Sequence, residues 1–133
     1  MNTLQHVLFL TMEEVLEIHR DQITNYGGSL GVRDQGLLES ALAQPNASFS
    51  GEYLHKDIFE MAAAYSYHLI ENHPFTDGNK RVGVVSALVF LDFNGIEIEV
   101  ENDVLERFTL DLASGKLSKN QVAEFFRSHS KYI

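Results

Sequence analysis

The chain contains no cysteine among its 133 residues, which excludes disulfides, cysteine nucleophiles and thiolate metal sites. This absence is consistent with a reducing cytoplasm. Basic residues are also scarce, since ten Lys and Arg stand against 19 Asp and Glu, for a formal net charge of −9. Nucleic-acid-binding proteins carry a basic excess on at least one face, so the composition argues against nucleic acid as a partner.

Long apolar runs are absent as well. The longest one, residues 82–93, is interrupted by Asp92 and is too short to cross a bilayer. The N-terminus has no basic segment followed by an apolar stretch, so no secretory signal is expected. We therefore expect one soluble cytoplasmic domain, residues 1–133, that does not bind a membrane.

Hydrophobic periodicity and capping residues predict a mainly α fold. The expected helices cover residues 11–27, 34–44, 57–72, about 79–93, roughly 103–113 and roughly 119–129. The other segments are read as a strand or extended lead-in at 7–10, a glycine-rich connection at 28–36, a loop or small β-hairpin at 45–55 and a short strand at 96–100.

The junction between the two central helices carries the strongest chemical signal. Pro74 ends the first helix, and the second opens at Gly78, where a missing side chain lets a ligand approach the backbone. The N-terminus of a helix favours an anion. Lys80 and Arg81 place two cations there, which is unfavourable unless a negative group such as phosphate is bound.

Three further side chains of this loop suit phosphate chemistry. His73 supplies an imidazole, the side chain that most often accepts a hydroxyl proton in catalysis. Asp77 supplies a carboxylate beside the phosphates, where a Mg²⁺ ligand would have to lie. Asn79 can donate an amide N–H to a phosphate oxygen.

Each residue also has a structural interpretation. Asp77 could cap the second helix or pair with Arg81, His73 could belong to an ordinary turn, and Lys80 could be a solvated surface charge. All of these would have to hold together within nine residues, so their joint occurrence favours a functional site. The six histidines form no H-E-x-x-H pattern, so a zinc hydrolase is not indicated.

The segment HPFTDGNKR, residues 73–81, resembles the signature of the Fic/Doc family, H-P-F-x-D/E-G-N-G-R-x-x-R. Two positions depart from it, because Lys80 replaces a glycine and Val84 replaces the second arginine. The Doc branch, the death-on-curing toxins, also has N-K-R where this chain has residues 79–81. It likewise lacks the arginine at the position of Val84. The similarity extends from about residue 9 to residue 126. It implies a compact helical Fic fold, with residues 45–55 as a β-hairpin flap that docks the target.

The resemblance also implies an activity. Most Fic proteins transfer AMP from ATP to a protein hydroxyl, whereas Doc toxins phosphorylate a threonine of elongation factor Tu and so inhibit translation. The two departures, Lys80 and Val84, favour phosphoryl transfer from Mg-ATP to a Thr or Ser hydroxyl. AMP transfer and a catalytically silent binding module are the alternatives.

The family also implies a role for each residue of the motif. His73 is expected to be the catalytic base and Asp77 the Mg²⁺ ligand. The phosphates are expected to bind Gly78, Asn79, Lys80 and Arg81.

A cognate antitoxin is the second expected partner. The chain has no copy of the family's inhibitory pattern, S/T-x-x-x-E-G/N, and its nearest approach, residues 48–52, is followed by Tyr53. Restraint of the toxin would therefore come from another chain. Doc toxins are neutralised by a small protein whose tail folds as a helix into a groove.

Overall fold

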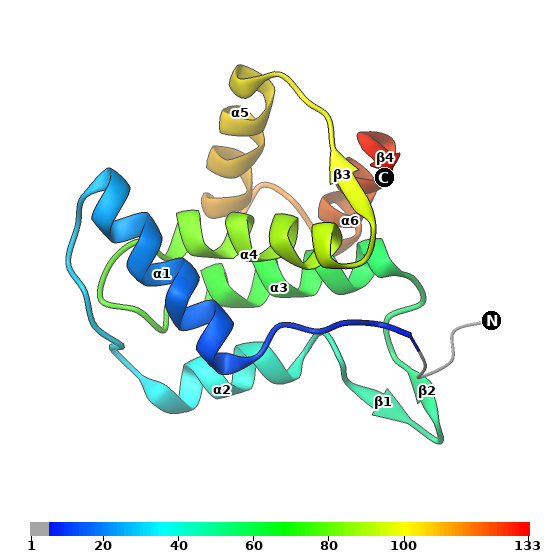
Figure 1. Ribbon diagram of the computed structural model, residues 1–133, viewed down its shortest axis with the longest axis horizontal. Coiled ribbons are helices and arrows are strands. Elements are labelled where there is room, and N and C mark those ends of the chain that lie inside the picture. Colours follow the sequence, from blue (N-terminus) through cyan, green and yellow to red (C-terminus); the bar gives the residue numbers. More distant parts are fainter. Residues whose placement is uncertain (1–5) are drawn as a thin grey trace.

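The computed structural model describes residues 6–133, and these are mainly helical (Figure 1). The helices are α1 (Met12–Tyr26), α2 (Gln35–Ala43), α3 (Ile58–Asn72), α4 (Asn79–Phe93), α5 (Asn102–Ala113) and α6 (Lys119–Ser128). Four short strands form two antiparallel pairs, β1 (Ser48–Phe49) with β2 (Glu52–Tyr53) and β3 (Ile96–Ile98) with β4 (Ser130–Tyr132).

Helices α3 and α4 form the centre of the molecule and run side by side (Figure 1). A glycine, Gly83, permits their close approach, because a Cβ there would lie 2.9 Å from Ile70 Cγ1 and 3.1 Å from the Ser66 carbonyl oxygen. Helices α2 and α6 pack against α3, while α1 and α5 pack against α4. The two central helices are thus covered by the rest of the fold, and the loop that joins them is held by neighbours on several sides.

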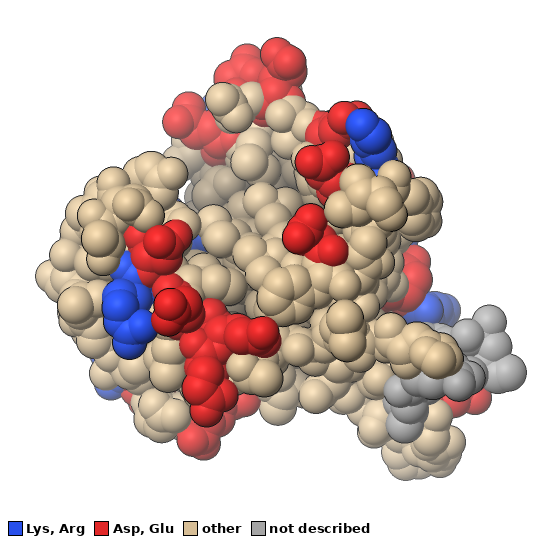
Figure 2. All heavy atoms as spheres, viewed as in Figure 1, with Lys and Arg blue, Asp and Glu red and all other residues tan. Residues whose placement is uncertain are grey.

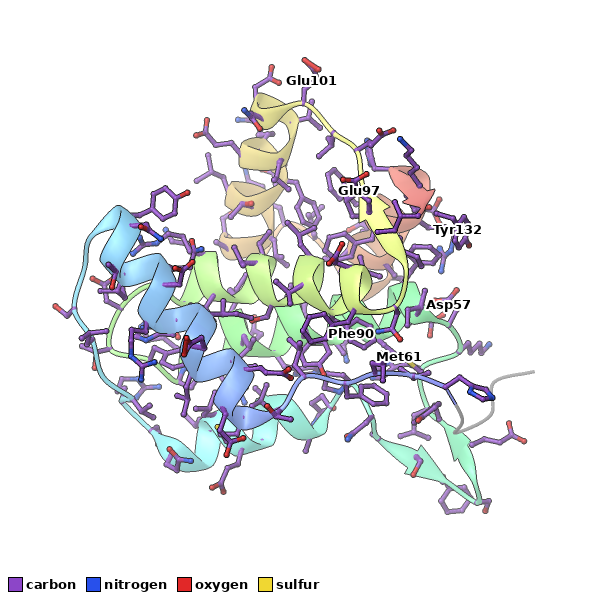
Figure 3. All side chains as sticks on the ribbon, in the orientation of Figure 1. Asp57, Met61, Phe90, Glu97, Glu101 and Tyr132 are labelled. Atoms are coloured by element: carbon purple, nitrogen blue, oxygen red, sulfur yellow. The ribbon has the colours of Figure 1, made fainter. Side chains whose placement is uncertain are left out.

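Aromatic side chains fill the core at the C-terminal end of α4. Phe90 is fully buried and lies 5.0 Å from the ring of Tyr65 and 5.6 Å from the ring of Phe9, between ring centroids. Figure 3 shows Phe90 and Met61 in the interior. The extended N-terminal segment is held by the Tyr65 hydroxyl, which accepts from the Leu10 N–H at 2.9 Å.

The mainly α fold and the hairpin are confirmed, and the main differences concern short segments. Residues 7–10 form an extended lead-in, one of the two forms expected, and do not pair as a strand, because the side chain of Asn94 takes both backbone hydrogen bonds of Leu8. The strand expected at 96–100 ends at Ile98. Its partner β4 follows α6 and was not expected from the sequence.

The β1–β2 hairpin lies away from the loop that carries the motif (Figure 1). Tyr53, at its base, packs edge-on against Phe9, which in turn stacks on Phe90 near the end of α4. The motif lies at the opposite end of α4. The hairpin therefore forms as expected, but the expectation that it docks the target against the active site does not fit its position.

Acidic side chains gather on the face shown in Figure 2, over α1 and around β3 and the start of α5. The few ion pairs lie at the surface and contribute little to stability. No helix within residues 6–133 is both long and apolar enough to span a membrane.

An unusual pair of bases joins α3 to the start of α6. Lys119 Nζ lies 2.7 Å from His68 Nε2 and 5.6 Å from the centroid of the Tyr67 ring. Because an ammonium can only donate, His68 accepts as a neutral ring. Burial, the charge of Lys119 and nearby His55 together lower the pKa of His68 to about 4.

This pair predicts a measurable loss of stability in mild acid. The folded protein binds fewer protons at His68 than the unfolded chain, where the pKa is 6.5. The contribution of His68 is therefore complete above pH 6.5 and is lost as the pH falls towards 4. In His68→Gln, whose amide oxygen still accepts from Lys119, the melting temperature should fall less between pH 7 and pH 5 than in the wild type. The two proteins differ only at position 68, so equal falls would contradict the prediction.

Candidate active site

The loop between α3 and α4 depends on two left-handed residues. Pro74 ends α3 at Asn72, as expected, and His73 adopts φ 51° and ψ 52°. Gly78 adopts φ 80° and ψ 14°, which turns the chain into α4. The loop borders a pocket of about 500 Å³. The pocket is lined by Ile70, His73, Thr76, Asp77, Gly78, Asn79, Lys80, Arg81 and Ala113. The structure thus brings together all six residues expected at the site.

The N-terminus of α4 has no side-chain cap. The first helical hydrogen bond runs from the Val82 N–H to the Gly78 carbonyl oxygen, so the N–H groups of residues 79–81 have no partner within the helix. Asp77 neither caps α4 nor forms an ion pair with Arg81. Both structural interpretations of Asp77 are therefore excluded for the described residues, and the helix end is open to an anion.

The Asp77 carboxylate is held at the edge of the pocket. Its Oδ1 accepts from the Gly78 N–H at 2.9 Å, and its Oδ2 accepts from the Ser29 N–H at 3.2 Å. Residues 6–133 contain no group of three or more His, Asp or Glu side chains placed to hold a metal ion. Mg²⁺ commonly uses one or two carboxylates together with substrate phosphates, so one fixed, exposed carboxylate beside an open helix end fits that ion.

Asn79 has a different role from the one expected. Its Oδ1 accepts from the Phe75 N–H at 2.9 Å, while its Nδ2 lies 2.9 Å from the Phe75 carbonyl oxygen and 3.0 Å from His73 Nδ1. The side chain is buried, and both of its amide hydrogens are used within the loop. The expectation that this amide donates to a phosphate oxygen is therefore wrong for this conformation. Only the backbone N–H of Asn79 remains for an anion.

The same contact determines the tautomer of His73. Because Asn79 Nδ2 donates, Nδ1 of His73 accepts, and a neutral ring then carries its proton on Nε2. The His73 side chain is exposed on the pocket side, so the ring has room to turn. Acting as a base at Nε2 requires the other tautomer, which cannot accept from Asn79.

The two cations behave differently. Lys80 is exposed and forms no ion pair with any described residue. Arg81 donates to the carbonyl oxygens of Gln22 and Gly27 at 3.3 and 2.9 Å, and so ties α4 to the C-terminal end of α1. A guanidinium has five N–H groups, so Arg81 retains donors for a ligand in the pocket that it lines.

The glycine-rich connection, residues 28–36, packs beside the loop that carries the motif and holds its backbone. Backbone bonds join it to the loop, because the Arg33 N–H donates to the Pro74 carbonyl oxygen and the Thr76 N–H to that of Gly31. Arg33 Nε also donates to the carbonyl oxygen of His73 at 2.7 Å. The sequence suggested only a connection here, although an arginine within a glycine-rich stretch was the available signal.

His19 is the other contributor that the sequence did not indicate. Its ring lies beneath the loop, with its centroid 4.0 Å from that of Phe75 and the two rings nearly parallel.

Val84 is the second residue that departs from the family signature, where it replaces an arginine. Its side chain is buried and places no charge near the pocket.

Comparison with known proteins gives the same family as the motif does. A family model described as the Fic/DOC family matches residues 9–91. Protein kinase doc of Escherichia phage P1 is 33% identical over 118 residues, which cover 89% of this chain and 92% of the relative. Toxin Doc of Mycolicibacterium smegmatis is 40% identical over 79 residues, which cover 59% of this chain and 61% of that protein.

Two neighbouring glycines provide a matched test of the site. Both have positive φ, 89° at Gly27 and 120° at Gly28, so alanine at either position should cost about 1–3 kcal/mol of stability. Only at Gly28 would the Cβ collide, lying 2.7 Å from Asp77 Oδ2 and 3.2 Å from Arg81 Nη2. Gly28→Ala should therefore weaken binding of Mg-ATP by about tenfold or more relative to Gly27→Ala, as measured by calorimetry. Equal affinities would show that neither Asp77 nor Arg81 contacts the ligand.

Proposed function

The chain belongs to the Fic/DOC family, and from this membership we propose that it is a Doc-type toxin that phosphorylates a target protein. The donor would be Mg-ATP, and the acceptor a Thr or Ser hydroxyl. One observation carries the proposal: His73 and Asp77 line the same pocket, at the uncapped N-terminus of a buried helix. The relatives named Protein kinase doc and Toxin Doc support a transferase and a toxin.

The pocket supplies several groups for the phosphates. The backbone N–H groups at the start of α4 and the side chains of Lys80 and Arg81 would hold the phosphate oxygens. Asp77 would hold Mg²⁺, which, when bound, offsets the negative charge that develops on the phosphates. Catalysis would consist mainly of positioning and electrostatics.

His73 would remove the proton of the attacking hydroxyl. The hydroxyl oxygen forms a bond to the γ-phosphorus, the bond from that phosphorus to the β,γ-bridging oxygen breaks, and ADP leaves. The neutral ring that accepts from Asn79 has its lone pair on Nδ1, so the ring gives up that contact, turns Nδ1 towards the hydroxyl and takes the proton there. Its exposure in the pocket allows that rotation.

Two residues favour phosphoryl transfer over AMP transfer. In the resembled family the glycine at position 80 and the arginine at position 84 serve the AMP-transferring pose. Here Lys80 lines the pocket and Val84 is buried, so neither feature of that pose is present. A nucleotide in the reversed direction would place its γ-phosphate beside His73.

The target would reach His73 along the glycine-rich connection. Residues 27–32 are exposed, and the segment is joined to the loop by the backbone bridge between Val32 and Phe75. The target segment is therefore assigned to this edge rather than to the β1–β2 hairpin. By the family resemblance, the target is a translation factor such as elongation factor Tu, modified in the cytoplasm.

A groove beside the pocket suits the helical tail of an antitoxin. It has a volume of about 460 Å³ and is lined by α1, α4 and α5, with Val85, Leu88 and Leu110 among its apolar residues. Arg81 lines both the groove and the pocket. The acidic surface favours a basic partner segment (Figure 2).

The proposed reaction predicts the mass of the product. After incubation with Mg-ATP, elongation factor Tu should gain the mass of one phosphoryl group in intact-mass analysis. His73→Ala should reduce the rate by about 10²–10⁴-fold, because the base is lost while the phosphate site remains.

Other products would identify the alternatives. An adduct with the mass of AMP would reject phosphorylation and support nucleotidyl transfer. Equal growth of a susceptible host on expression of the wild type and of His73→Ala, with no modified protein in either, would indicate a silent binding module.

The groove gives a separate prediction about neutralisation. Leu110 is 52% exposed, so Leu110→Asp should fold normally but bind the antitoxin at least tenfold more weakly and remain toxic when both are expressed. Val104→Asp, at a comparably exposed position of α5 outside this groove, is the matched control and should still be neutralised. Neutralisation of both variants would place the antitoxin elsewhere.

A further inference from the structure

A buried histidine supports the active-site loop from below. His19 belongs to α1 and is only 4% exposed. Its ring lies nearly parallel to that of Phe75, at an interplanar angle of 8°. The other residues that α1 buries, Val15 and Ile23, are apolar. An apolar side chain would pack equally well at this position. A buried imidazole is therefore expected to form a hydrogen bond that offsets the cost of burying its polar nitrogens.

His19 forms this hydrogen bond with the loop. His19 Nε2 lies 2.9 Å from the backbone carbonyl oxygen of Asp77. A carbonyl oxygen only accepts, so the ring nitrogen donates and carries a proton in either charge state. Position 19 therefore supplies a fixed donor to the residue whose carboxylate faces the pocket.

We propose that His19 is a positioning residue, whose hydrogen bond to the Asp77 backbone determines where the Asp77 carboxylate meets a metal ion. This inference rests on the proposed role of Asp77. The carboxylate is already held by the N–H groups of Ser29 and Gly78, so the His19 bond fixes the same residue at its backbone. Groups that orient a metal ligand from behind typically change metal affinity by about 10–100-fold when they are removed.

The chain offers a matched control in His129. Its ring packs on Phe125 at 4.4 Å between centroids, and its Nδ1 lies 2.8 Å from the Phe125 carbonyl oxygen. The same two kinds of contact thus occur at the end of α6, and His129 does not line the pocket. Replacing each histidine by phenylalanine removes its hydrogen bond to a backbone carbonyl oxygen and keeps an aromatic ring.

The test measures Mg²⁺ affinity by calorimetry, at a fixed concentration of a non-hydrolysable ATP analogue. His19→Phe should weaken Mg²⁺ binding by about tenfold or more and leave metal-free binding of the analogue unchanged. His19→Gln, whose amide can donate, should recover most of the affinity. His129→Phe should match the wild type. The backbone amide of Gly78 should shift in the NMR spectrum of metal-free His19→Phe but not of His129→Phe.

Several results would overturn the proposal. One is a folded His19→Phe protein with wild-type Mg²⁺ affinity. Another is an equal loss in His19→Gln and His19→Phe, which would assign the effect to ring packing. Asp77→Asn separates the two levels of inference. If it keeps wild-type Mg²⁺ affinity, the proposed metal role of Asp77 fails and the role of His19 fails with it. If only Asp77→Asn loses affinity, the metal role stands and the role of His19 fails.

Discussion

The site depends on the start of a buried helix that no side chain caps. Three backbone N–H groups at the beginning of α4 have no partner within the helix, and the carboxylate of Asp77 beside them is held by other groups. Most helices of this chain are capped by Asp, Ser or Thr, as at Asp34, Asp57 and Ser118. The described helices without a side-chain cap are α4 and α5, and at α4 the open end borders the pocket that the motif lines.

The loop keeps this arrangement because neighbours on both sides hold its backbone. From within, the buried side chain of Asn79 joins Phe75 to His73. From outside, Arg33 and His19 hold the carbonyl oxygens of His73 and Asp77. These contacts come from α1 and the glycine-rich connection, which are distant in sequence from the motif. Geometry at the site is thus a property of the whole N-terminal half.

Much of this could be predicted from the sequence, because the strongest signals are local. Pro74 ended one helix, Gly78 began the next, and the caps located the other helices to within a few residues. Long-range contacts left no such pattern. Neither the bond from Arg33 to His73 nor the pairing of β4 with β3 has a periodic signature. The role of Asn79 was missed for the same reason, since a motif does not show which donors are already in use.

The shared position of Arg81 has a thermodynamic consequence. Its guanidinium lines both the pocket and the groove, and also ties α4 to the end of α1. Occupants of the two places would contact one side chain, so their binding free energies are coupled. Such coupling is reciprocal: whatever factor a groove ligand imposes on nucleotide affinity, the nucleotide imposes on the affinity of the groove ligand. Under the proposed function, cellular nucleotide levels would help to set how tightly an antitoxin in the groove binds the chain.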